Sequence, residues 1–470
     1  MSGEVEGVPL QADDIVMEGE SAKAGLQNRE EKKSLAGRLE DNASSSSWVV
    51  DMEKMLEDTN PSAEAARWEK RCIYRVPEYI KEMTNSKAYQ PRFVSLGPLH
   101  HGEPGLLPME QHKRRAVLHM VRRSGKSLGE FVRAIEEVAD ELEAAYDDLD
   151  DKWRGANRRS FVEVMVTDGC FLLELIRTYV KLLQGEEDDY GANDPVFGSR
   201  VFHNLWPVLF TDMIAMENQL PLLVLQCLLE AQLGTSPSAQ GINSFVLLFL
   251  NRVEENMDSL GLHPLDIYHN SYCTGTSPHD WEGSDDYEAR TGCAVELDEA
   301  GIHFKKSTTR SIHDIDFENS TLSMPLFNFN DDTEAILLNL MAFEWMHPDA
   351  RHDLLYYISF VDKIINSERD VALLRSMGLI ENMMSSDRKV VEIFNNLSKL
   401  AMMDRSSRLG HIQWKLNAHC RKRRNKWRAS FVHTYLSNPW VFISLVAAII
   451  LLVVTVLQTV YTVVPFYTKG

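Results

Sequence analysis

The longest apolar stretch of the chain lies near its C-terminal end. Residues 440–457 read WVFISLVAAIILLVVTVL, and no charged residue follows before Lys469. This stretch of about 25 uncharged residues exceeds the roughly 20 that a helix needs to cross a bilayer. Trp440 at one end and Tyr467 at the other suit aromatic rings placed at the two water interfaces. We therefore predict a single transmembrane helix over residues 439–466.

Before this stretch, apolar residues recur mainly at helical spacing. Residues 161–183 and 208–233 are strongly apolar and predict two helices at the centre of a hydrophobic core. Residues 128–146 carry many charges and predict one long, solvated helical arm. Shorter periodic segments predict further helices at residues 109–120, 245–257, 332–345, 353–366, 370–377 and 387–402.

The spacing changes between residues 302 and 329, where short runs of β-forming residues alternate with turn residues. This pattern predicts a small antiparallel β meander. Residues 91–108 contain too many prolines and glycines for a helix and predict an ordered loop. Residues 234–241 and 270–292 are also expected to be loops, the second of them mobile. The fold class is therefore mainly α, with a large helical body, one small sheet and a C-terminal transmembrane helix.

Composition divides the chain into four parts. Residues 1–46 are polar and acidic, and they cannot bury enough apolar surface to fold alone, so we expect a disordered arm. Residues 47–410 are predicted to form the helical globular body, and Ser47 is expected to cap a short amphipathic helix at its start. Residues 411–438 are expected to form a basic juxtamembrane helix, followed by the anchor over residues 439–466.

The charges beside the apolar stretch predict its orientation. Seven basic residues precede it and only Lys469 follows, so the body is expected in the cytosol. The acidic N-terminus shows no signal peptide. The chain thus has the pattern of a tail-anchored protein, with the plasma membrane favoured over internal membranes. The basic residues, which also face an anionic leaflet favourably, are Lys415, Arg421, Lys422, Arg423, Arg424, Lys426 and Arg428.

Composition and charge restrict the partners. The 470 residues carry a formal net charge of −20, which would repel a polyanion, so nucleic acid is not expected as a partner. The six cysteines form no CxxC pair and are expected to be free thiols in a reducing compartment. Sequons at Asn42, Asn319 and Asn396 would matter only if the orientation were reversed. The expected partners are the lipid bilayer and other proteins, and no cofactor is expected.

Three carboxylates are the most informative polar residues. Asp168, Asp212 and Glu217 have apolar neighbours three and four residues away on their predicted helices, where an unpaired charge would be costly. One interpretation is that they cap or pair with nearby loops, with Arg92, Lys113 or Arg114 as partners. The alternative is a catalytic or metal-binding carboxylate group. The structural interpretation is preferred, because clear ligand spacing is missing.

Histidines cluster beside the predicted loop. His100, His101 and His112 lie near Glu110, but the HExxH and Glu-x-x-His spacings of metal sites are absent. A loop packed by its own histidines is therefore favoured over a metal site. The chain also has no nucleophile elbow, kinase motif, dinucleotide fingerprint or phosphate-binding loop. We therefore assign no catalytic, cofactor-binding or metal-binding residue.

Several longer segments carry a resemblance to a known family. They are IYRVPEYI (73–80), VSLGPLHHGEPGLLPMEQHK (94–113), VTDGCFLLELI (166–176), DMIAMENQLPLLVL (212–225), AVELDEAGIHFK (294–305) and MPLFNFNDDTEAILLNLMAFE (324–344). Together they resemble the plant "domain of unknown function 247" family, although the chain departs from the usual family residues at Leu99, Ser320 and Trp345. The resemblance covers about residues 48–466 and implies a plant membrane protein to which no enzymatic activity is assigned. It also implies, for some grass relatives, an association with self-incompatibility.

Two functional hypotheses follow. The first is a non-enzymatic, membrane-anchored interaction or signalling protein, for which a recognition role like that of the self-incompatibility relatives is one form. The second is an uncharacterised enzyme that uses the carboxylates and histidines near residues 91–108. The two hypotheses differ in geometry, because an enzyme needs these side chains to line an open pocket.

Overall fold

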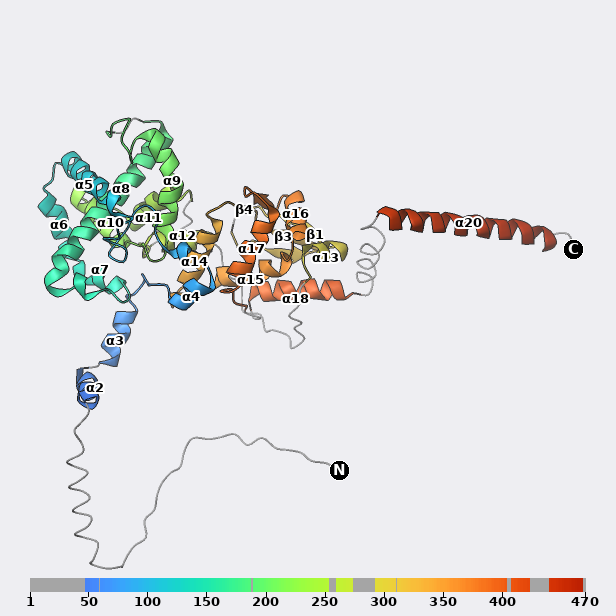
Figure 1. Cartoon of the computed structure of the whole chain (residues 1–470), viewed down its shortest axis with the longest axis horizontal. Helices are drawn as coiled ribbons and strands as arrows, with labels where there is room; N and C mark the ends of the chain where they lie inside the picture. Colours follow the sequence, from blue (N-terminus) through green and yellow to red (C-terminus); the bar gives the residue numbers. More distant parts are fainter. Residues whose placement is uncertain are drawn as a thin grey trace, which may run out of the picture. The chain divides into compact units, whose positions relative to one another are not determined.

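The computed structural model is mainly helical, as the sequence predicts (Figure 1). It forms two units, Met1–Trp68 and Glu69–Gly470. The expected disordered arm, residues 1–46, and most of the loop expected at residues 270–292 lie outside the described residues. The structure describes residues 47–58, 60–186, 189–252, 259–273, 292–309, 311–403, 407–422 and 439–467.

The described part of the first unit contains two short helices. Helix α2 spans Ser47–Asp58 and α3 spans Pro61–Trp68. The short amphipathic helix predicted from Ser47 is therefore confirmed, and Pro61 begins the next helix, where its missing N–H costs nothing. The larger apolar side chains of α2, Trp48, Met52, Met55 and Leu56, are exposed.

In the second unit, one long helix organises the core. Helix α8, Arg158–Gln184, packs against α5 (Glu110–Ser124), α6 (Leu128–Glu136), α10 (Leu222–Leu233) and α11 (Ala239–Phe249), as Figure 1 shows. This confirms the predicted apolar helix over residues 161–183.

A glycine sets the close approach between α8 and α10. A Cβ atom on Gly169 would lie 2.6 Å from Val224 Cγ1 and 2.5 Å from Leu228 Cδ1. Any side chain at this position would therefore force the side chains of Val224 and Leu228, or the helices that carry them, to move. Gly169 directly follows Asp168, so the same turn of α8 combines tight helix packing with a buried carboxylate.

The prediction of one long solvated arm at residues 128–146 is wrong. The segment forms two helices, α6 and α7 (Ala139–Ala145), and α6 packs against α8 and α10. Phe131, Ile135 and Leu142 are at most 1% exposed. These residues form an apolar stripe at helical spacing that the surrounding charges concealed, and burying the stripe outweighs solvation of the polar face.

The apolar run at residues 208–233 is not a single helix. It contains the end of α9 (Ser199–Ile214) and all of α10, separated by a sharp break. Pro221 lies directly before α10 and restricts the preceding residue to extended conformations. The polar side chains of residues 217–219, within the break, accept hydrogen bonds from the backbone amides of Val76, Leu96 and Leu265, and they belong to the site described below.

The remaining helical elements confirm the helices predicted between residues 332 and 402 and add α12 and α13. Short 3₁₀ turns connect several of them. In chain order these elements are α4 (Glu78–Met83), η1 (Ser86–Tyr89), η2 (Leu107–Met109), η3 (Asp151–Trp153), η4 (Gly155–Asn157), α12 (Pro264–Tyr272), α13 (Ala294–Glu299), α14 (Thr333–Met346), α15 (Asp353–Ile364), α16 (Glu368–Ser376), α17 (Asp387–Leu397) and α18 (Arg408–Arg421). The helix predicted at residues 245–257 is wrong in its bounds, because α11 begins at Ala239, inside the loop expected at residues 234–241, and ends at Phe249.

A small sheet occupies residues 303–324, but its pairing is mixed rather than an antiparallel meander. Strands β1 (His303–Lys306), β2 (Asp316–Glu318) and β3 (Thr321–Met324) have the order β1-β3-β2. Strands β2 and β3 form an antiparallel hairpin whose turn, Asn319–Ser320, has positive φ angles at both residues. Such a turn favours a tight hairpin. Strand β1 pairs with β3 in parallel.

The last run of β-forming residues in the predicted meander belongs to a different sheet. Strand β4, Phe327–Phe329, pairs in parallel with β5, Ile380–Asn382. Pro325 follows β3 directly and has no backbone N–H to donate, so the chain leaves the first sheet there. The strand β5 was not predicted, because three residues carry too little periodic signal.

The last described helix, α20, spans Pro439–Tyr467. Within it, Trp440–Val460 is long and apolar enough to cross a membrane, and none of that window is buried. In contrast to α20, helix α18, which contains the start of the predicted juxtamembrane segment, packs on α15 and β2 and buries Ile412 and Leu416. Of the expected basic flank, Lys415, Arg421 and Lys422 are described, whereas Arg423, Arg424, Lys426 and Arg428 lie outside the described residues.

Candidate functional site

The predicted carboxylates meet the loop of residues 91–108 inside the body. We call this region the polar centre, defined as Asp168, Asp212, Glu217, Asn218 and Gln219 together with the groups they bind. All five side chains belong to residues that are at most 2% exposed. They come from α8, the end of α9 and the break before α10.

Asp212 binds the start of the loop through three consecutive backbone amides. Its Oδ1 accepts a hydrogen bond from the N–H of Arg92 at 2.8 Å, and Oδ2 accepts from Phe93 at 2.7 Å and Val94 at 2.8 Å. Burial raises the pKa of this carboxyl, although the three amides act in the opposite direction. The Arg92 guanidinium donates to Thr211 and Asp332 instead. The arrangement fixes a loop that has no regular backbone pairing of its own.

Asp168 binds the middle of the loop and a buried lysine. Its Oδ2 accepts from the N–H of Gly97 at 2.8 Å, and its Oδ1 lies 2.7 Å from Lys113 Nζ. Lys113 also lies 2.7 Å from Glu110 Oε1 and donates to Ser95 Oγ at 3.0 Å. Burial raises the pKa of Asp168, and the Lys113 ammonium opposes that shift.

Glu217 binds the segment that precedes the loop. Its Oε1 accepts from the N–H of Val76 and lies 2.7 Å from Lys81 Nζ, while Oε2 lies 3.4 Å from His100 Nε2. Burial acts to raise the pKa of Glu217, but hydrogen bonds from His100 and Lys81 hold it below the usual value. His100 also contacts Glu103 at 2.6 Å. Burial opposes protonation of His100, yet the two carboxylates raise its pKa.

Asn218 and Gln219 complete the polar centre, and the sequence reasoning missed both. Asn218 Oδ1 accepts from the N–H of Leu96, and its Nδ2 donates to the carbonyls of Val94 and Asp212. Gln219 donates to the carbonyls of Met213 and Ala215 and accepts from the N–H of Leu265. A polar ENQ triplet inside an apolar run was the available signal.

The other predicted residues lie outside the polar centre. His101 contacts the Trp153 ring edge-on, and His112 Nδ1 lies 2.9 Å from Arg115. Burial, followed by the charge of Arg115, lowers the pKa of His112. Arg114 is exposed and is not among the partners of the three carboxylates given above. The structure therefore does not bring the three histidines together.

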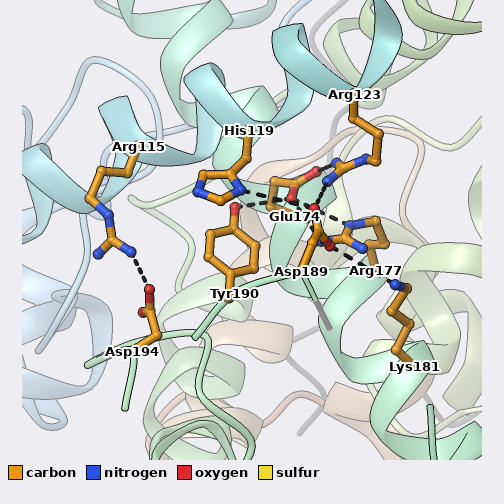
Figure 2. A network of polar contacts seen from close by, with 9 residues as sticks. All are labelled: Arg115, His119, Arg123, Glu174, Arg177, Lys181, Asp189, Tyr190 and Asp194. Carbon is orange, nitrogen blue, oxygen red and sulfur yellow. Dashed lines mark hydrogen bonds and ion pairs between the residues drawn. The ribbon is translucent and has the colours of Figure 1, made fainter. Parts of the chain in front are cut away.

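A second network of charged residues lies between α5 and α8 (Figure 2). Arg123 and Arg177 both pair with Glu174, a residue that is 1% exposed, and the Tyr190 hydroxyl donates to the same carboxylate at 3.0 Å. Asp189 lies 2.8 Å from Arg123 and 2.7 Å from Arg177. Three and four residues from Glu174 lie Cys170 and Phe171 on one side but Arg177 and Thr178 on the other, so the fully apolar surroundings that identified Asp168 are only half present here.

The same network continues to the segment before α9. Arg115 pairs with Asp194, whose Oδ1 accepts from the amides of Val196 and Phe197 at 2.9 Å (Figure 2). His119 stacks on Tyr190 at 4.1 Å between ring centroids. Burial and then the Glu174 carboxylate raise the pKa of the Tyr190 phenol, so it remains a hydrogen-bond donor. These contacts connect chain segments and leave their charges paired.

A third buried cluster joins α12 and α14. His269 Nε2 lies 2.7 Å from Glu344 Oε1 and 3.5 Å from Cys273 Sγ. One ligand atom from each of the three residues lies within 4.8 Å of the others, and all three residues are buried. Among the described residues, this is the His/Cys/Asp/Glu group with spacing suited to a metal ion. The sequence reasoning missed it because His269 and Glu344 are far apart in the chain.

The chemistry open to the polar centre is limited by its bonds. A general base or nucleophile needs a lone pair that can reach a substrate. Asp212 borders a cavity of about 240 Å³, but both of its oxygens already accept backbone amides. Asp168 and Glu217 are likewise each engaged by an amide and a lysine. This arrangement is suited to fixing the loop of residues 91–108.

Comparison with known proteins agrees with the sequence motifs. A family model described as "Plant protein of unknown function", DUF247, matches residues 73–454. UPF0481 protein At3g47200 of Arabidopsis thaliana is 28% identical over 430 residues, covering 84% of this chain and 87% of that protein. A second UPF0481 protein of the same plant, At3g02645, is 22% identical over 517 residues, covering 87% of this chain and 93% of the relative. No solved structure matches significantly. The resemblance is thus confirmed, and the chain belongs to the DUF247 family of plant proteins, whose function is unknown.

Proposed function

We propose that this protein is a single-pass membrane protein whose helical body works on the cytosolic side as a binding protein rather than as an enzyme. The observation that carries the proposal is that the long apolar stretch of helix α20 is left unburied. Trp440–Val460 contains 21 residues and none of it is buried. Side chains such as Leu451 and Leu452 are more than 60% exposed. Such a surface is unfavourable in water and favourable in hydrocarbon.

The proposed orientation rests on charge. Lys415, Arg421 and Lys422 begin a basic segment that continues through residues 423–428 before α20, while Lys469 stands alone after it. Basic residues near a membrane span favour the cytoplasmic side. We propose the plasma membrane as the destination, where the anionic inner leaflet would attract this segment.

The non-enzymatic part of the proposal rests on the polar centre. Its three carboxylates hold backbone amides and lysines, and their chemistry is used in positioning a loop. Partner proteins would then bind to the surface of the body, whose shape depends on the loop that the polar centre holds in position. The enzyme hypothesis has no specific observation in its favour at these residues.

Protease protection in sealed vesicles tests the orientation. Protease added outside cytosol-side-out vesicles should digest the body and leave only a fragment that contains α20. Alkaline carbonate should fail to extract the undigested protein. Asn319 provides an internal reporter, because it lies in the exposed β2–β3 turn. A glycan on Asn319 or a protected body would overturn the cytosolic orientation and place the body where direct cell-to-cell recognition can occur.

Proximity labelling tests the binding role. A labelling enzyme would be fused to the N-terminus of the full chain, and the control would carry the same enzyme on α20 with its basic flank alone. The proposal expects a set of neighbours that depends on the body. If both fusions label the same proteins, the body does not select partners and the binding role is wrong.

A further inference from the structure

The buried cluster of His269, Cys273 and Glu344 brings three potential metal ligands together and leaves one ring nitrogen without a hydrogen bond. His269 lies on α12. Cys273 comes directly after the last residue of that helix, four positions beyond His269, so the two side chains share one face. Glu344 faces them from α14. The three residues are 3%, 4% and 0% exposed, so each polar group needs a partner within the protein.

The contacts converge on a single nitrogen. His269 Nε2 faces both Glu344 Oε1 and Cys273 Sγ, while His269 Nδ1 has no hydrogen-bond partner in the described structure. A Cys–His–acid relay would place the thiol and the carboxylate at opposite ring nitrogens. The observed geometry therefore excludes a relay of that kind. Three ligand atoms within 4.8 Å of one another are instead an arrangement that one metal ion can use.

Charge supports the same reading. A thiolate and a carboxylate together carry two negative charges, and a neutral imidazole carries none. One divalent cation would therefore leave the metal-bound cluster neutral, so that binding places no net charge in the interior.

The donor set indicates the class of metal. Thiolate and imidazole ligands favour zinc and related transition metals, whereas calcium and magnesium prefer oxygen alone. Ligand atoms around tetrahedral zinc are about 3.3 to 3.5 Å apart, given bond lengths of about 2.0 to 2.3 Å. The 3.5 Å between Cys273 and His269 already fits, and the 2.7 Å to Glu344 requires a small outward movement of the carboxylate.

The residues around the cluster hold one of the proposed ligands in place by hydrogen bonds, and a cavity adjoins the other two. Glu344 Oε1 accepts from the N–H of Leu354 at 2.8 Å, and Oε2 accepts from Leu355 at 2.9 Å, so the first turn of α15 orients the carboxylate. A ligating carboxylate held in this way is typical of metal sites. A cavity of about 310 Å³ borders His269 and Cys273 and can admit water as a fourth ligand.

We infer that His269, Cys273 and Glu344 bind one zinc-class divalent metal ion that links α12 to α14. The ion has three protein ligands and a fourth position directed to the adjoining cavity. Because Glu344 is also bound to the first turn of α15, the ion stabilises the junction of three helices.

Metal analysis of the full-length protein in detergent provides the test. After gel filtration in chelator-free buffer, we expect about one zinc per chain. Cys273→Ser should weaken zinc binding at least tenfold. Cys72→Ser is the matched control, because Cys72 is equally buried and lines the same cavity but is not a proposed ligand. It should leave zinc binding unchanged.

Cobalt substitution tests the ligand identity even where a variant folds poorly. Cobalt bound to the wild-type chain should show a thiolate-to-metal charge-transfer band, which the Cys72→Ser variant should retain. Zinc should also raise the melting temperature of the wild-type chain and a chelator should lower it. The inference is overturned if the wild-type chain binds neither metal, if bound cobalt lacks the thiolate band, or if a folded Cys273→Ser variant binds zinc as tightly as the wild type.

Discussion

Asp168 and Lys113 form an ion pair of 2.7 Å in which the lysine side chain is 0% and the aspartate 1% exposed. The pair joins the middle of α8 to the first turn of α5. The same carboxylate binds the amide of Gly97, so helix packing and the position of the loop depend on one side chain. Removing one partner of such a buried ion pair is costly, because the charge of the other partner then remains unpaired in the interior.

The first prediction concerns this pair. The substitution Asp168→Asn should lower the free energy of unfolding by about 3 to 5 kcal/mol, because Lys113 would then keep Glu110 alone as an ionic partner among the described residues. The matched control is Glu392→Gln, which breaks an exposed pair with Arg388 and should cost less than about 1 kcal/mol. Denaturant unfolding of the full chain in detergent measures both changes. Equal losses in the two variants would contradict the structural role of Asp168.

The second prediction compares two glycines with similar backbone angles. Gly97 has φ +74° and Gly125 has φ +68°. A Cβ on Gly97 would lie 2.7 Å from both the carbonyl oxygen of Gln219 and the hydroxyl of Tyr146, whereas nothing lies within 4 Å at Gly125. Gly125→Ala should therefore cost only the left-handed strain of about 1 to 2 kcal/mol. Gly97→Ala should cost roughly 1 to 3 kcal/mol more, because the neighbours must move.

Thermal melting of both alanine variants distinguishes these contributions. A clearly lower melting temperature for Gly97→Ala is expected, with Gly125→Ala closer to the wild type. Similar melting temperatures would mean that the loop relaxes freely, and the polar centre would then not be rigid at this point.

The third prediction concerns pH. His263 is completely buried, its Nε2 donates to the carbonyl of Cys72 and its Nδ1 accepts from the amide of Asp266. This assigns the neutral tautomer with both nitrogens satisfied. Burial lowers the pKa of His263 from 6.5 to about 4; Asp266 and the carbonyl of Cys72 oppose this shift, and nearby His347 adds to it. The folded state therefore binds fewer protons than the unfolded state between these values.

Stability should consequently fall as the pH is lowered through that window. The loss attributable to His263 is on the order of 3 kcal/mol between pH 6.5 and pH 4. His263→Gln should remove this part of the pH dependence, while His303→Gln, at an exposed position, should leave it unchanged. The free energy of unfolding of the wild type and of both variants, measured at several pH values, tests this prediction. An unchanged slope in His263→Gln would assign the acid sensitivity to other groups.

The fourth prediction separates the anchor from its basic flank. Deleting residues 440–464 should release the protein into the soluble fraction, because surface charge attraction is screened within about 8 Å at physiological salt. A spanning helix is held far more firmly than a charged surface segment. Changing Arg421–Arg424 to glutamine with α20 kept should leave the protein on membranes but disturb its orientation or destination. A deletion variant that stays membrane-bound in high salt would require a second hydrophobic attachment.

Parts of the candidate sites were accessible from sequence. Apolar neighbours at helical spacing identified Asp168, Asp212 and Glu217 as buried, and Lys113 was named among the expected partners, whereas Arg92 binds Asp212 through its backbone amide and not through its guanidinium. The same signal is incomplete at Glu174 and Glu344, because polar residues stand among their neighbours three and four positions away. The amides that bind these carboxylates could not be predicted, because a backbone N–H carries no sequence signal and its position depends on how the loop folds.

What the sequence by itself determined was the mainly helical class, the apolar C-terminal helix and the family membership, because periodicity and long apolar runs are local properties. Only the tertiary structure decided that residues 128–146 pack as two helices and that β1 pairs with β3 in parallel. It alone brought His269 to Glu344, 75 positions away in the chain. Contacts at such separations depend on the packing of whole helices, and local patterns do not encode that packing.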